Sequence, residues 1–140
     1  MKRNLLFIII TAALIFAVTA EVKCQTATHM GTWKLASYNY GTSSGFIPVP
    51  KGDQHIKLIT ATHFMWAETD SATRKVWSMA GGTYTLNGNT YTESIDFGIN
   101  MDSYLGHNET FTLKVEGDLL FMSGILNDGY KVEEIWQRVK

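Results

Sequence analysis

Short turn signals divide most of the sequence into runs of nearly equal length. Residues 86–89 (LNGN), 116–118 (EGD) and 127–129 (NDG) place Gly beside Asn or Asp. Such pairs supply the positive φ that tight hairpin turns require. The runs between them are rich in Thr, Tyr, Ile, Val, Phe and Trp, which favour strands. Turns at roughly 8–12-residue intervals, with hardly any helical period, predict an all-β meander.

The turn signals delimit a series of expected strands. These strands are residues 31–40, 54–60, 63–69, 74–80, 82–86, 90–97, 109–116, 119–126 and 130–139. We expect 74–80 and 82–86 to form one strand bent at a bulge beside Gly81 and Gly82. About eight antiparallel strands then either stack as a sandwich or close into a barrel, and closure removes the exposed edges. The one helical candidate is residues 100–106, within a connecting loop.

The first 24 residues carry the pattern of an export signal. Lys2 and Arg3 precede the apolar run 5–18, which is shorter than the roughly 20 residues of a membrane span. We expect a signal peptide over residues 1–24, followed by one β-domain over residues 25–140. The mature protein would then be periplasmic or secreted. A retained amino-terminal anchor is the alternative.

Two cleavage positions fit this signal. Val18 and Ala20 provide the small-x-small pattern before a cut after Ala20, and a second cut is possible after Cys24. Attachment of lipid to Cys24 is disfavoured because Lys23 stands directly before it, where lipoprotein signals have a small residue. Cys24 is also the single cysteine of the chain, so an intrachain disulfide is impossible. The fold must therefore depend on core packing.

Charge in the mature part of the chain is low and evenly spread. The sequence has 12 Lys and Arg against 13 Asp and Glu. Residues 25–140 retain 9 and 12 of these, which gives a net charge of −3. Because there is no cluster of Lys or Arg, we expect no nucleic-acid partner.

Apolar and polar side chains alternate in residues 91–97, 111–116 and 130–139, as in half-buried strands with one wet face. The aromatic and apolar side chains expected to point inward are Phe64, Trp66, Tyr84, Tyr91, Phe97, Phe111, Met122 and Trp136. Such a set either fills a small barrel or lines a cavity for one small apolar ligand.

Two carboxylates, Glu93 and Glu134, fall on the same inner faces. A carboxylate among aromatic rings is costly unless it is paired or hydrogen-bonded. Each inward carboxylate therefore indicates one of three things: a strand register other than the one assumed here, a buried polar bridge, or a contact with a ligand. A few polar anchors in an apolar lining are typical of ligand sites, and for this reason we favour a pocket.

The sequence resembles the calycin or lipocalin family at both ends of the domain. Residues 31–33 (GTW) open the first strand and Arg138 lies on the last. The resemblance implies an antiparallel up-and-down barrel of about eight strands. It also implies that Trp33 plugs the closed end, with Arg138 across its indole ring in a cation–π contact.

The chain is most similar to small exported bacterial lipocalin-like domains of unknown function. The matching stretches are GTWKLASYNYG, HIKLITATHFMWAE, GGTYTLNGNTYTESIDF, FTLKVEGD and GYKVEEIWQRVK. Compared with classical lipocalins, this chain is shorter, has no disulfide and shows no clear carboxy-terminal helix. The resemblance therefore implies a family and a fold, and leaves the size of any cavity open.

The sequence offers little sign of metal or hydrolytic chemistry. His29, His55, His63 and His107 show no zinc-site spacing and have no cysteine partner, so we expect no metal and no cofactor. No Gly-x-Ser-x-Gly motif is present. Glu68, Glu93 and Glu134 would make an acid–base pair only if two of them met inside the barrel. We favour a structural bridge to Arg138 or to tyrosine hydroxyls.

These observations predict a binding protein for one small hydrophobic or amphipathic molecule. The expected ligand-binding residues are Phe64, Trp66, Tyr84, Tyr91, Glu93, Phe97, Phe111, Met122, Glu134 and Trp136. Residues 98–107 would lie over the open end of the barrel. The alternatives are a barrel enzyme that uses inward carboxylates, and an interaction module with a solid core and no pocket.

Overall fold

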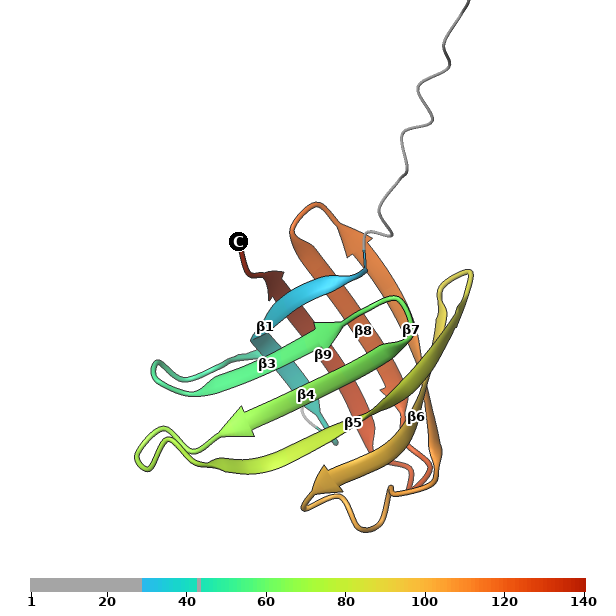
Figure 1. Cartoon of the computed structure of the whole chain (residues 1–140). Coiled ribbons are helices and arrows are strands. Elements are labelled where there is room, and N and C mark those ends of the chain that lie inside the picture. The colour runs from blue at the N-terminus through green and yellow to red at the C-terminus, as the bar shows by residue number, and fades with distance from the viewer. Residues whose placement is uncertain (1–28, 43) are drawn as a thin grey trace, which may run out of the picture.

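A computed structural model describes residues 29–42 and 44–140 (Figure 1). The expected signal peptide, both cleavage positions and Cys24 lie outside the described residues. The described residues form nine strands. These are β1 (Gly31–Tyr40), β2 (Ile47–Pro48), β3 (Gln54–Ile59), β4 (His63–Thr69), β5 (Val76–Asn87), β6 (Thr90–Ile99), β7 (Asn108–Glu116), β8 (Leu119–Ile125) and β9 (Lys131–Arg138). The prediction of an all-β chain is confirmed.

The strands close into an antiparallel barrel. From β3 to β9 each strand pairs with the next along the chain, and β1 pairs with both β3 and β9. Eight strands therefore form the barrel, and the short β2 adds to the free half of one edge of β1. Figure 1 shows β3–β5, in green, crossing in front of β7–β9, in orange to red. Closure leaves the barrel strands without a long open edge.

The expected bulge lies at the glycine pair of β5, with its extra residue on the neighbouring strand β6. The pairing of β5 with β6 shifts between Gly81 and Gly82, so Asp96 is an extra residue on β6. A Cβ atom on Gly82 would lie 1.9 Å from the carbonyl oxygen of Ser94, which excludes any larger side chain at this position. Residues 74–80 and 82–86 were expected to belong to one bent strand, and β5 confirms this.

Because of the bulge, one residue that was predicted to point inward, Phe97, points outward. Phe97 lies after the extra residue, so it does not share the inner face of Tyr91, Glu93 and Ile95. Its side chain is 50% exposed, and its ring lies against Gly81 on the outer surface. The prediction that Phe97 points inward is wrong because an inserted residue reverses the alternation of a strand.

Two local features also differ from the sequence expectation. The two-residue strand β2 lies within the proline-containing loop and was not predicted; it is too short to show any alternation. Residues 100–106 form a succession of turns and no helix. This segment packs inward through Met101 and Tyr104, which contact a small core cluster around Phe64 and Ile95.

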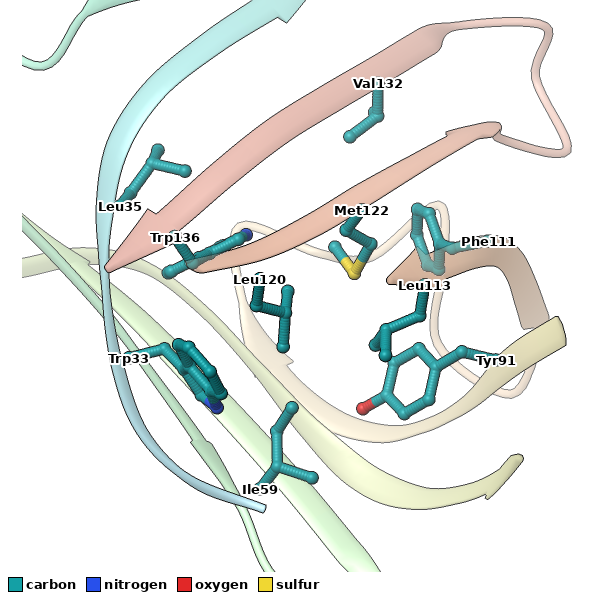
Figure 2. Packing of buried hydrophobic residues seen from close by; sticks show 10 residues of the cluster. All are labelled: Trp33, Leu35, Ile59, Tyr91, Phe111, Leu113, Leu120, Met122, Val132 and Trp136. Atoms are coloured by element: carbon teal, nitrogen blue, oxygen red, sulfur yellow. The ribbon is translucent and has the colours of Figure 1, made fainter. Parts of the chain in front are cut away.

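A cluster of buried apolar side chains lies inside the barrel and fills the end that holds Trp33. Figure 2 shows the ten residues of this cluster, from β1, β3 and β6–β9, pointing toward a common interior. Four of them, Phe111, Met122, Val132 and Trp136, extend along the wall into the other half of the barrel.

At the Trp33 end the guanidinium carbon of Arg138 lies 4.0 Å from the ring centroid of Trp33. The indole Nε1 of Trp33 donates a hydrogen bond to the carbonyl of His29, and Arg138 donates one to the carbonyl of Met30. These two hydrogen bonds hold the residues directly before β1, His29 and Met30, across the closed end, or floor, of the barrel.

Candidate functional site

The other half of the barrel contains a cavity of about 360 Å³. Its walls come from the inner faces of β3–β9 and from Tyr40 at the end of β1. Met101 and Tyr104 of the loop after β6, and Leu126 and Tyr130 from the connection between β8 and β9, also border it. These two connections and the adjoining strand ends form the mouth of the barrel, opposite Trp33.

A buried ion pair lies inside this barrel. The Nζ of Lys57 is 2.6 Å from Oε1 of Glu93, and the two side chains are only 1% and 3% exposed. Because burial of either charge alone would be very costly, the pair forms a unit in which each charge compensates the other. Lys57 also donates to the sulfur of Met122 at 3.5 Å.

Aromatic rings surround the same ammonium group. Its Nζ lies 5.6 to 6.0 Å from the ring centroids of Phe64, Tyr91, Phe111 and Trp136. These distances are within the range of cation–π attraction, which grows when the cation is removed from water. The charge of Lys57 is therefore held by Glu93 and by four rings.

Glu134 is a second buried carboxylate at the cavity wall. The hydroxyl of Tyr40 donates to its Oε1 at 2.5 Å, and Nε1 of Trp136 donates to its Oε2 at 2.9 Å. Burial raises the pKa of Glu134, while the attraction of Lys57 and the two hydrogen bonds act in the opposite direction. Burial, together with the nearby Glu134 carboxylate, raises the pKa of Tyr40.

His55 lies on the same wall, between two indole rings. Its ring centroid is 5.1 Å from that of Trp66 and 4.9 Å from that of Trp136. Its Nε2 is buried and has no hydrogen-bond partner among the described residues. Burial, and to a smaller degree the charge of Lys57, lowers the pKa of His55 to about 4. The imidazole is therefore neutral at physiological pH.

Two more carboxylates border the cavity. Glu109 is buried and accepts hydrogen bonds from the backbone N–H and the side-chain amide of Asn127, each at 3.0 Å. Glu68 lies near the mouth, and burial is the main cause that raises the pKa of its carboxyl group. The cavity thus combines aromatic walls with several acidic groups.

The structure brings six of the ten expected ligand-binding residues to the cavity wall: Trp66, Glu93, Phe111, Met122, Glu134 and Trp136. Phe64 and Tyr91 are buried beside Lys57 and do not line the cavity. Tyr84 lies toward the closed end, where its hydroxyl donates to the carbonyl of Thr60 at 2.7 Å. Phe97 lies outside the barrel.

Three interior residues with basic or acidic side chains were missed: His55, Lys57 and Glu109. A signal for each was present in the alternation. His55 and Lys57 share a face with Ile59 on β3, and Glu109 shares a face with Phe111 on β7. A charged side chain in an inward position is ordinarily assigned to the wet face of a strand. Here the pairing register with the neighbouring strands places all three side chains inside the barrel.

Residues other than Arg138 contact the two inner carboxylates. Glu93 pairs with Lys57, and Glu134 accepts from the hydroxyl of Tyr40, in line with the tyrosine part of that expectation. Across residues 29–42 and 44–140, no group of three or more His, Asp or Glu side chains is placed to hold a metal ion. None of these residues forms a helix that is long and apolar enough to cross a membrane.

A comparison with protein-family models places the barrel in a family. Residues 28–140 match the model described as Domain of unknown function (DUF4488). The chain belongs to the DUF4488 family. The DUF4488 match spans every strand from β1 to β9 and therefore includes the whole cavity. A search of curated proteins gave no match.

Proposed function

We propose that this member of the DUF4488 family is a lipocalin-like binding protein that holds one small hydrophobic or amphipathic molecule inside its barrel. The observation that carries the proposal is the cavity, whose volume of about 360 Å³ falls in the range of ligand pockets. Its walls are mainly aromatic and apolar, with a few buried polar groups. The eight-stranded antiparallel barrel and the Trp33–Arg138 contact at its floor support the lipocalin-like part of the proposal.

An acid–base enzyme is the second candidate, and one observation favours it. Glu134 borders the cavity and burial raises its pKa, as a general acid would require. Against this role, both of its oxygens already accept hydrogen bonds, from Tyr40 and Trp136. The Glu93 carboxylate is held by Lys57. We therefore rank binding before catalysis.

We further propose that the protein acts outside the cytoplasm, on the strength of the signal pattern in residues 1–24. Amino-terminal sequencing of the protein recovered from its own host tests this. A first residue at position 21 or 25 supports export, whereas an intact Met1 in a cytoplasmic fraction contradicts it.

Tryptophan fluorescence offers a direct test of binding. Three of the four tryptophans, Trp66, Trp77 and Trp136, border the cavity, and Trp33 lies at the closed end. We expect the neutral fluorophore N-phenylnaphthylamine to bind and to quench this emission by energy transfer. Native mass spectrometry of protein purified from its host would show whether a small molecule co-purifies.

A matched pair of variants connects binding to the cavity. Ser78 is buried at the cavity wall, and Ser123 is exposed on β8. The substitution Ser78→Phe should fill part of the cavity and weaken binding of the fluorophore at least about tenfold. The control Ser123→Phe adds the same ring outside the barrel and should leave binding unchanged. Equal affinity in both variants, or no binding to the unmodified protein, would overturn the proposal.

A further inference from the structure

We propose that the molecule held in the barrel carries an organic cation, such as a protonated amine, beside its apolar part. The inference rests on the proposed binding function and specifies the chemistry of the ligand. It starts from the charges of the cavity wall. Among the described residues that border the cavity, Lys57 is the single Lys or Arg, against the carboxylates of Glu68, Glu93, Glu109 and Glu134.

The positive charge of Lys57 is already engaged. Its Nζ contacts Glu93 at 2.6 Å, lies among four aromatic rings and has a side chain only 1% exposed. An anionic ligand would have to displace Glu93 to reach it and would leave that carboxylate buried without a partner. Since a buried carboxylate without a partner is strongly destabilising, the site disfavours anions.

Two of the remaining acidic groups, Glu134 and Glu109, have neutral hydrogen-bond donors. Glu134 accepts from a phenol and an indole, and Glu109 accepts from the backbone and side chain of Asn127. Such donors orient a carboxylate without cancelling its charge. A cation in a cavity with mainly apolar walls gains more from a carboxylate than it would in water. The same attraction favours the ionised form of Glu134, whose pKa burial raises.

Two independent features of the wall suit an ammonium group. The indoles of Trp66 and Trp77 border the cavity and are not among the rings that surround Lys57, so they offer faces for cation–π contact. The buried Nε2 of His55 has no hydrogen-bond partner within residues 29–42 and 44–140. In the neutral imidazole one ring nitrogen is an acceptor, and an ammonium group brings three donors. The apolar part of the ligand would then lie against Phe111 and Met122.

Three indole compounds of matched length test the inference: tryptamine as the cation, tryptophol as the neutral form and indoleacetate as the anion. Isothermal titration calorimetry at neutral pH should show tryptamine binding at least about tenfold more tightly than tryptophol, and indoleacetate binding most weakly. Tryptophol or indoleacetate binding as tightly as tryptamine would overturn the inference and leave the proposed function standing. Failure of all three, and of N-phenylnaphthylamine, would overturn both.

Adjacent residues of β9 provide a matched pair of variants. Glu134 faces the cavity, whereas Glu133 faces outward and pairs with Lys131 at 2.9 Å. Glu134→Gln should reduce the preference for tryptamine over tryptophol at least fivefold, that is by about 1 kcal/mol. Glu133→Gln should leave the preference unchanged. Glu109→Gln gives a second measurement if Glu134→Gln does not fold, and an unchanged preference in every folded inner variant would overturn the inference.

Discussion

The two ends of this barrel differ in what their side chains do. At the closed end Trp33, Leu120 and Ile59 are buried in an apolar cluster, and Nε1 of Trp33 and Nη1 of Arg138 each donate a hydrogen bond to a backbone carbonyl. At the open end the inner face carries imidazole, carboxylate and phenol groups around a cavity. The same alternating strands supply both ends, so the difference lies in the residues placed at each level of the barrel.

The two ends also contribute differently to stability. Apolar burial at the closed end contributes favourable free energy, roughly 1.5–3 kcal/mol for each large side chain. Buried titratable groups at the open end cost free energy unless each one is compensated. A barrel that needed only stability would carry apolar residues at His55, Glu109 and Glu134. Their presence around a cavity supports the proposed ligand site, because such sites combine apolar walls with a few polar groups.

The largest expected effect on stability comes from breaking the buried ion pair of Lys57 and Glu93. The substitution Lys57→Met leaves Glu93 buried without its partner and should lower the free energy of unfolding by about 3–5 kcal/mol. The double variant Lys57→Met/Glu93→Leu should recover most of that loss. Chemical denaturation checks both. As a control, Lys34→Met on the exposed face of β1 should cost less than about 0.5 kcal/mol. A single variant at position 57 as mild as this control would contradict the prediction.

The next largest effect is a pH dependence of stability that His55, at the open end of the barrel, should cause. In the unfolded chain His55 takes up a proton near pH 6.5, but in the folded protein its pKa is about 4. Between these values the unfolded state binds more protons, so stability is lost as pH falls through this window. The loss attributable to His55 is up to about 3 kcal/mol, since each pKa unit corresponds to about 1.4 kcal/mol.

Urea denaturation between pH 4 and 7 measures this effect. The variant His55→Gln should lose the His55 part of the pH dependence. The substitution Gln54→Asn, at the exposed first residue of the same strand, removes no titratable group and should retain the wild-type slope. Plots of the free energy of unfolding against pH that run parallel for the wild type and His55→Gln would contradict the prediction. They would show that His55 takes up its proton as easily in the folded state as in the unfolded one.

The smallest effect tests whether the two ends are independent. The substitution Arg138→Met removes the cation above Trp33 and the hydrogen bond to the carbonyl of Met30, so it should cost about 1–2 kcal/mol of stability. Affinity for N-phenylnaphthylamine should not change, because the cavity lies at the other end. A weakening of binding as large as that caused by Ser78→Phe would show that the floor and the mouth are coupled.

The sequence by itself determined the strands and many of their inner faces. Turn residues and period-two alternation are local properties, so eight of the nine strands, including the join at Gly81 and Gly82 within β5, were predicted closely. The inward positions of Glu93 and Glu134 followed from the same alternation. The resemblance of residues 31–33 and Arg138 to a known pattern added the contact at the barrel floor.

Only the tertiary structure decided which charges meet and where space remains. Phe97 turned outward because the bulge on β6 depends on its pairing with β5. Lys57 meets Glu93, and Glu134 meets Tyr40 across 94 positions of the chain, because barrel closure and register bring distant strands together. Register and closure are properties of pairs of strands, and an alternating pattern within one strand contains no information about its partner.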